Sequence, residues 1–250
     1  DNDANGVGTL SGTNPTLNAS TAGTINLQSA GDITTSNYLT GATYKNLTVR
    51  TKGNANITVD ANIDLLANGG TTLTLYSNGD LNLGANRTLK TAAGGNISLS
   101  ADYDATGFGT LFASNATLNA STTGTINLQS ASDITTSNYL TGGTYKYLDV
   151  RTSGNSNITV DANIDLLANG GTTLNLYSNG NLDLGAGRTL RTAAGGTLNL
   201  YADYNADGVG TLSATNPTLN ASTSGAIRLQ SAGDITTSNY LTGAIYKGLS

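Results

Sequence analysis

The stretch TINLQSAGDITTS, residues 24–36, decides the fold of this chain. Aliphatic residues alternate with polar ones in Ile25-Asn-Leu27, and a second short run starts at Asp32 after a break that contains glycine. Such alternation is typical of a half-buried β-strand, because successive side chains of a strand point to opposite faces. Residues 24–29 return 101 residues later at 125–130, and residues 32–41 return at 133–142 and 234–243. The chain is therefore a tandem repeat.

Two full repeat units and part of a third make up the 250 residues. They span residues 1–101, 102–202 and 203–250, without insertion or deletion, and about three quarters of the aligned positions in the two full units are identical. Both ends of the chain fall inside a repeat, so we expect a parent protein that continues in both directions. We also expect the three segments to form one continuous solenoid, in which each coil packs only on its neighbours.

Each repeat unit divides further into four unequal coils. The pattern aliphatic-x-aliphatic-x-small starts at Ile25, Leu47, Leu73, Ile97 and Ile126, at spacings of 22, 26, 24 and 29 residues. Within a coil three short alternating runs can be aligned, for example 25–29, 32–36 and 38–40, which would turn Ile25, Leu27, Ile33 and Leu39 inward. The sequence therefore predicts an all-β fold, a right-handed parallel β-helix with three sides and about ten coils of 22–29 residues.

Composition excludes several classes of function. The chain has no His, no Cys and no Met, so it lacks the common ligands of zinc, copper and haem, as well as the imidazole and thiol of hydrolytic triads. We therefore expect no cofactor and no enzyme activity. The net charge is −5 and the 11 Lys and Arg residues are scattered, which argues against nucleic acid as a partner. No apolar run approaches the ~18 residues of a membrane span, so we expect no membrane insertion of this segment.

The strings GTINLQSAGDITT (23–35), NLTVRTKGNANITVD (46–60) and TLTLYSNGDLNL (72–83) resemble the β-helical shafts of filamentous-haemagglutinin-type exoproteins. These are large adhesins secreted by the two-partner pathway, and the resemblance extends over all 250 residues. It implies an extracellular or cell-surface fibre, without disulfides and without catalysis in the shaft. The coils of 22 to 29 residues are less uniform than those of many such shafts.

The resulting hypothesis is a structural, non-catalytic rod segment of a large repetitive secreted cell-surface adhesin or fibre. The alternative is a subunit of a self-associating extracellular filament or sheath, and an ice- or glycan-binding solenoid is a third possibility. The partners expected are copies of the chain, neighbouring repeats of the same long chain, and host or surface glycans.

One motif with metal-binding chemistry opens each repeat, and it resembles the first half of an EF-hand calcium loop. Oxygen ligands stand at alternate positions before a glycine at the sixth, which suits a hard cation. The acidic residue expected at the twelfth position is absent, since Gly12, Ala113 and Ala214 stand there. The competing interpretation is a polar turn closed by Asp and Asn side chains. The predicted calcium ligands are Asp1, Asp3, Asn5, Asp102, Asp104, Thr106, Asp203, Asn205 and Asp207.

Three further sets of residues have a structural and a functional interpretation. Asp60 and Asp64, repeated as Asp161 and Asp165, can be read as paired carboxylates for glycoside hydrolysis, but a corner among small residues favours a structural role. Outward threonines such as Thr34, Thr48, Thr58 and Thr74 can be read as an ice-binding array, although β-propensity alone explains them. Exposed tyrosines are expected either to contact sugars or a sister rod, or to stack along a sheet face: Tyr38, Tyr44, Tyr76, Tyr103, Tyr139, Tyr145, Tyr177 and Tyr204.

Overall fold

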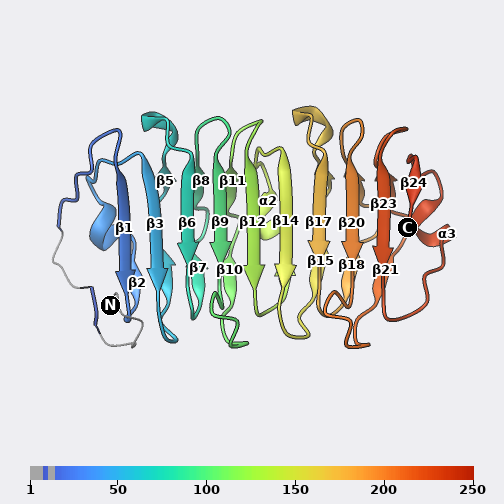
Figure 1. Ribbon diagram of the computed structural model, residues 1–250, viewed down its shortest axis with the longest axis horizontal. Helices are drawn as coiled ribbons and strands as arrows, with labels where there is room; N and C mark the ends of the chain where they lie inside the picture. Colours follow the sequence, from blue (N-terminus) through green and yellow to red (C-terminus); the bar gives the residue numbers. More distant parts are fainter. Residues whose placement is uncertain (1–7, 11–14) are drawn as a thin grey trace. The chain divides into compact units, whose positions relative to one another are not determined.

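A computed structural model describes residues 8–10 and 15–250 of the chain (Figure 1). It is an all-β parallel β-solenoid of about nine turns, which confirms the predicted fold class. The chain forms two compact units. Unit 1 comprises Asp1–Ala131 and Asn138–Thr144, and unit 2 comprises Ser132–Ser137 and Tyr145–Ser250. These limits do not coincide with the 101-residue repeats.

Unit 1 contains three parallel sheets, one for each side of the coil. The front sheet, nearest the viewer in Figure 1, has the order β1(Thr24–Ser29), β3(Asn46–Thr51), β6(Thr72–Tyr76), β9(Asn96–Ser100), β12(Thr125–Ser130). The second sheet has the order β2(Ile33–Thr34), β4(Ile57–Val59), β7(Leu81–Leu83), β10(Leu111–Ala113). The third sheet has the order β5(Ile63–Asp64), β8(Thr88–Lys90), β11(Thr117–Asn119). The one-turn helices of this part are α1(Ser36–Leu39), η1(Leu66–Asn68) and residues 138–140 of α2(Ser137–Leu140).

Unit 2 repeats the plan. Its front sheet has the order β14(Tyr147–Thr152), β17(Thr173–Tyr177), β20(Thr197–Tyr201), β23(Ala226–Gln230), β24(Gly248–Leu249). The second sheet has the order β13(Ile134–Thr135), β15(Ile158–Val160), β18(Leu182–Leu184), β21(Leu212–Ala214). The third sheet has the order β16(Ile164–Asp165), β19(Thr189–Arg191), β22(Thr218–Asn220). The short helices of this unit are η2(Leu167–Asn169) and α3(Ser238–Leu241).

The strand register aligns the predicted coil starts with one another. In unit 1 the pairs run Ile25↔Leu47, Leu47↔Leu73, Leu73↔Ile97 and Ile97↔Ile126, without a slip. Almost all of these side chains are fully buried. Burying an aliphatic side chain stabilises by ~2 kcal/mol, and each coil covers the apolar interior of the next. Coils of different length thus keep one register, because the extra residues lie at the corners.

The handedness of the coil can be followed in Figure 1. Within each unit the front strands point down the page, the chain returns behind them, and the next front strand lies to the right. A path that descends in front, rises behind and advances to the right is a right-handed helix. This agrees with the prediction and with the strong preference of parallel crossovers for that hand.

Buried hydroxyl groups close the corners after β3 and β6, at the small residue of the repeating pattern. Thr51 Oγ1 donates to the carbonyl of Ala55 at 2.7 Å, and Ser77 Oγ reaches the same carbonyl at 2.9 Å. The two hydroxyl oxygens are 3.2 Å apart. The same carbonyl also accepts the Gly79 N–H at 3.0 Å, so the buried polar groups of this corner bond one another and avoid the ~1–3 kcal/mol cost of an unpaired buried group.

Polar side chains at the corners reach from one coil to the next. Asp32 Oδ1 accepts the N–H of Asn56 at 2.8 Å, and Asn56 Oδ1 accepts the N–H of Asp80 at 2.7 Å. Asp80 Oδ1 in turn accepts the N–H of Thr110 at 2.8 Å. The corner backbone of each of these coils is therefore satisfied by a side chain of the coil before it.

The first coil of the repeat departs from the predicted three-strand plan. Residues 38–40 were expected to be a strand with Leu39 inside, but Ser36–Leu39 forms helix α1, which buries Tyr38 and leaves Leu39 half-exposed. Asp60 of the next coil accepts the Ser36 N–H at 2.9 Å and so holds the start of this turn. Alternation over three residues cannot distinguish a strand from one helical turn.

The described part of the chain forms about nine turns, in agreement with the predicted number of about ten coils. In the coil that begins at β23, no second-sheet strand precedes α3 among the described residues. Among the described residues, no helix is long and apolar enough to cross a membrane.

The register of the front sheet predicts opposite outcomes for two neighbouring residues of β3. Val49→Asp is expected to lower the free energy of unfolding by more than ~4 kcal/mol, because Val49 is fully buried and the carboxylate would have no partner. Thr48→Asp is the control, since Thr48 points outward and the second repeat carries Asp149 at the same position. Urea denaturation of both variants checks this, and equal losses of stability would contradict the inward assignment of Val49.

Candidate functional site

The Asp-rich loop of the second repeat is a compact turn around a buried carboxylate. Asp102 is fully buried, and its Oδ1 accepts the N–H groups of Gly107 at 3.0 Å and Phe108 at 3.3 Å. Thr106 Oγ1 lies 3.2 Å from Asp102 Oδ1 and 3.1 Å from Asp104 Oδ1. The backbone of Asp102 has a φ of 56°, a conformation that Asp tolerates better than most residues. The loop thus matches the turn interpretation.

In the loop of the third repeat, Asp203 takes the place of Asp102, but the surrounding side chains bond differently. Both carboxylate oxygens of Asp203 lie 3.2–3.3 Å from the N–H of Gly208. Asp207 Oδ1 accepts the N–H of Val209 at 2.9 Å, and its Oδ2 accepts from Asn205 Nδ2 at 2.8 Å. These two hydrogen bonds, the backbone one foremost, lower the pKa of Asp207 below its usual value.

The calcium ligands predicted from the sequence remain a prediction. Asp1, Asp3 and Asn5 lie outside the described residues. Over the residues that are described, no three His, Cys, Asp or Glu side chains stand close enough together to hold a metal ion. In the second and third repeats, bonds to N–H groups occupy the carboxylates nearest the turn. A cation would have to compete with these bonds.

Asp60 and its repeat Asp161 make hydrogen bonds that hold a turn of the neighbouring coil. Asp60 Oδ1 accepts from the Ser36 N–H at 2.9 Å and from Thr35 Oγ1 at 3.2 Å, and Oδ2 accepts from Ser36 Oγ. Partial burial opposes ionisation, but the hydrogen bonds from Ser36 and Thr35 outweigh it and lower the pKa of Asp60. Asp161 makes the same bonds to Ser137 and Thr136, with the same direction of shift.

Asp64 and Asp165 pair with cations in the third sheet. Asp64 Oδ2 lies 3.9 Å from Lys90 Nζ, and Asp165 Oδ2 lies 3.3 Å from Arg191, its register partner in β19. Each also accepts the N–H two residues ahead, at Leu66 and Leu167. These roles favour the structural interpretation of the acidic pairs.

Three of the tyrosines expected at the surface are buried. Tyr38, Tyr139 and Tyr145 expose 6%, 2% and 7% of their area. The helical turn at residues 36–39 directs Tyr38 inward, where its hydroxyl donates to the Leu10 carbonyl at 2.8 Å. Tyr139 does the same with the Leu111 carbonyl. The buried phenol fills the interior of the first coil and also satisfies a carbonyl of the preceding one.

Four of the remaining tyrosines, Tyr76, Tyr103, Tyr177 and Tyr204, form stacks with an arginine within each unit. Tyr76 stacks on Tyr103 with ring centres 4.3 Å apart, and the Arg50 guanidinium lies 5.1 Å from the Tyr76 ring centre. In unit 2 the corresponding trio is Arg151, Tyr177 and Tyr204. The partner in each stack is the loop tyrosine, not the copy in the neighbouring repeat. Tyr103 and Tyr204 expose 45% and 43% of their area.

The two full repeats differ in the chemistry of the side chains on the outward side of the front sheet. The inward residues are the same in both, apart from the exchange of Ile97 for Leu198. Of the outward residues, Thr48, Thr74 and Ser98 of the first repeat are replaced by Asp149, Asn175 and Asn199 in the second. Asn46 and Ser100 are replaced by Tyr147 and Tyr201.

In unit 2 the outward residues form a hydrogen-bonded ladder across four front strands. Asn175 Nδ2 donates to Asp149 Oδ2 at 3.0 Å, and Asn199 Nδ2 donates to Asn175 Oδ1 at 2.7 Å. Arg228 lies 3.3 Å from Asn199 Oδ1, and Arg151 forms two bonds to Asp149, at 2.6 and 2.9 Å. This ladder was not predicted from the sequence. Aligning the repeats and comparing only alternate positions of each strand would have found it.

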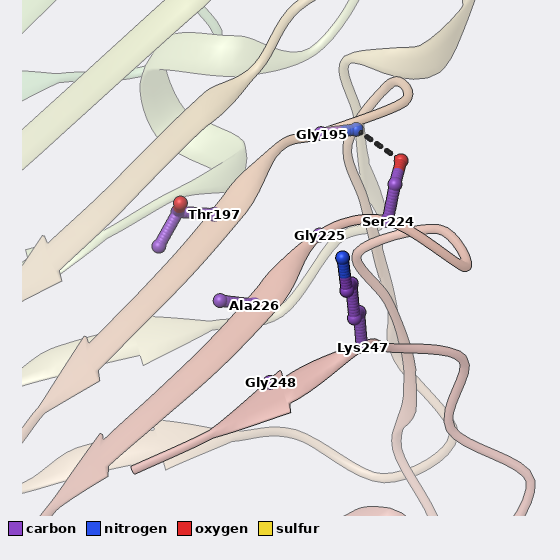
Figure 2. Close-up of a pocket in the computed structure, with 7 residues that line it drawn as sticks. All are labelled: Gly195, Thr197, Ser224, Gly225, Ala226, Lys247 and Gly248. Carbon is purple, nitrogen blue, oxygen red and sulfur yellow. Dashed lines mark hydrogen bonds between the residues drawn. The ribbon is translucent and has the colours of Figure 1, made fainter.

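A shallow depression of about 340 Å³ lies at the end of the same sheet in unit 2 (Figure 2). Ala226 and Gly248, which are register partners, leave space where the first repeat has Thr24 and Asn46. Figure 2 shows Lys247 at its side and Ser224 Oγ accepting the Gly195 N–H, a bond of 2.8 Å. The lining residues are Gly195, Thr197, Ser224, Gly225, Ala226, Lys247 and Gly248.

The lowered pKa of Asp60 predicts a pH-dependent contribution to stability. The ionised group stabilises the fold above its unfolded pKa of about 3.9, and this contribution is lost as the pH falls through the lower folded pKa. Asp60→Asn is therefore expected to be less stable than the native chain at neutral pH and equally stable near pH ~2. Thermal melts across this range check it against Asp64→Asn, which removes only an exposed ion pair of 3.9 Å.

Calcium titration separates the two interpretations of the Asp-rich loops. Since N–H groups already bond the central carboxylates, we expect neither calcium nor a chelator to change the melting temperature. The opposite result would be a melting temperature that rises with calcium in the native chain but not in the double variant Asp104→Asn with Asp207→Asn. It would establish the calcium site, because a ligand stabilises the state that binds it.

Comparison with known protein families, with curated proteins and with solved structures finds no match to this chain. Its function is therefore argued from its own residues and geometry.

Proposed function

We propose that this chain is a structural, non-catalytic segment of a large repetitive secreted protein of the cell surface, an adhesin or fibre of the filamentous-haemagglutinin type. The observation that carries the proposal is that residues vary between the repeats on the outward side of the strands and much less on the inward side. The inward positions and the register are kept from repeat to repeat, while the outward ones change. This is expected of a scaffold whose purpose is to be extended.

The coil geometry supports a role in spacing. Each coil adds one strand to the front sheet, at ~4.8 Å per strand, so a repeat of four coils adds ~19 Å. Lengthening the protein requires only further copies of the same 101-residue unit. The absence of Cys in the sequence is compatible with such a fibre, because the stability of each coil comes from its neighbours and not from cross-links.

A second candidate, a subunit of a self-associating filament, is favoured by one observation in unit 1. Phe108 and Phe112 are the two Phe residues of the chain, and they expose 71% and 50% of their area. Large exposed aromatic residues are enriched where proteins associate. The third repeat has Val209 and Ser213 at these positions, so any such contact would be specific to the second repeat.

Cryo-electron microscopy of the native material tests the proposed role. We expect single fibres attached to cells, with an axial repeat of ~19 Å built from strands ~4.8 Å apart. Fibres that join side by side or end to end would favour the filament subunit. Material without the axial repeat would contradict both.

The second candidate has its own test in two substitutions. If the phenylalanines hold copies together, Phe108→Val with Phe112→Ser should abolish self-association in sedimentation velocity. Both replacements occur at the same positions of the third repeat, so the fold is expected to tolerate them. Association that survives the double variant would remove this surface from consideration.

A further inference from the structure

The outward side of the front sheet in unit 2 has the features of a binding surface, which a spacer does not need. It combines a preformed hydrogen-bond ladder, a group of tyrosines and a depression, all carried by strands β14, β17, β20, β23 and β24. At the ladder positions the first repeat instead has Thr48, Thr74 and Ser98, while it keeps Arg50 and Tyr76 where unit 2 has Arg151 and Tyr177. The chain therefore carries a version of the same surface that lacks the residues of the ladder, with nearly the same core beneath it.

The polar groups of this surface are arranged for hydroxyl-rich ligands. Asp149, Asn175 and Asn199 present planar carboxylate and amide groups, which can bond neighbouring hydroxyls of a sugar. Their mutual bonds fix the side chains before any ligand arrives, and this lowers the entropic cost of binding. Residues two apart on a strand share a side, so the ladder is flanked by the tyrosines on one side and by the depression on the other.

The tyrosines supply an aromatic surface at one end of the strands. The ring centres of Tyr177 and Tyr201 are 5.2 Å apart, and those of Tyr177 and Tyr204 are 4.5 Å apart. Tyr is amphipathic and suits a ligand with both apolar and polar faces. From the depression to Tyr201 is four residues along β20, or ~13 Å, a span that fits several sugar units and not a single one.

The charges indicate which sugars fit. Arg228 stands two residues after Ala226 on β23, on the outward side of the strand, and among the described residues it forms no ion pair. Lys247 lines the depression, and it too forms no ion pair within the described part of the chain. The chain as a whole has a net charge of −5, so this local positive charge is not a general property of its surface. A carboxylate matches both cations, and Arg binds it with two bonds.

We propose that this face of unit 2, from the depression at Ala226 and Gly248 to the tyrosines, binds a polysaccharide that carries carboxylate groups, such as a polyuronate. The carboxylate of one sugar lies at the depression beside Lys247, within reach of Arg228, which stands two residues after the lining residue Ala226 on β23. The ladder from Asn199 to Asp149 bonds hydroxyls, and the tyrosines cover the next sugar ring. The proposal adds a binding activity to the structural role and does not depend on it.

The test is calorimetric titration of the full chain with oligogalacturonate, with neutral dextran as the comparison. We expect binding of oligogalacturonate only. Arg228→Asn, which installs the residue found as Asn26 and Asn127 in the other repeats, should weaken it about tenfold through the loss of a charge-assisted bond. Ala226→Thr with Gly248→Asn fills the depression without changing the charge and should weaken it similarly. The site of a Cβ at Gly248 is 3.7 Å from the nearest atom, Ala226 Cβ, an ordinary contact.

A matched control separates a site from general attraction of charge. Arg191→Asn removes one positive charge from the third sheet of the same unit, where Arg191 pairs with Asp165. It should leave binding unchanged, and melting curves should show all variants folded. The proposal is overturned if oligogalacturonate does not bind, if dextran binds equally well, if the filled depression binds normally, or if Arg191→Asn is as damaging as Arg228→Asn. None of these results bears on the axial repeat expected of a fibre.

Discussion

The constraint on which the whole structure depends is the in-register stacking of short parallel strands. A coil of two dozen residues cannot cover its own apolar side chains, so Leu47, Leu73 and their equivalents must lie directly over those of the neighbouring coils. A shift by one residue would turn every inward side chain outward. The register is therefore the same in coils of different length, and the differences in length are taken up at the corners.

That constraint divides the surface into two kinds of positions. Polar residues at corners, such as Asp60 and Asn56, bond backbone groups of a neighbouring coil, and both recur in the second repeat as Asp161 and Asn157. Outward residues in the middle of front strands bond no backbone and are free to change, as Thr48 and Asp149 show. Binding chemistry on this fold is therefore expected on the front sheet, where a substitution does not disturb the stack.

Most of the fold could be predicted from the sequence, because strand alternation and the repeat carry the same information. The coil starts at Ile25, Leu47 and Leu73 are register partners, as the pattern indicated. The turn at α1 was missed, since Tyr38 to Thr40 is too short a run to show a period and the carboxylate that holds it belongs to the next coil. The burial of Tyr38 was missed for the same reason.

The front-sheet ladder could not be predicted from one repeat alone, because Asn175 and Asn199 are 24 residues apart and meet only through the register. A comparison of the copies, restricted to outward positions, would have indicated it. The Asp-rich loops show the opposite difficulty, since the residues that resemble a metal site are also those that close a turn. Only the direction in which the carboxylate oxygens point distinguishes a metal site from a closed turn.

The corner bonds that pass from Asp32 to Asn56, from Asn56 to Asp80 and from Asp80 to Thr110 also give the solenoid a mechanical property. Each carries load between adjacent coils in parallel with the backbone ladder of the sheets. A pulling force along the chain would therefore peel one coil at a time, breaking one corner bond and one set of strand pairs at each step. Extension would be absorbed in small, repeated increments, and the coils still in place would keep their own contacts.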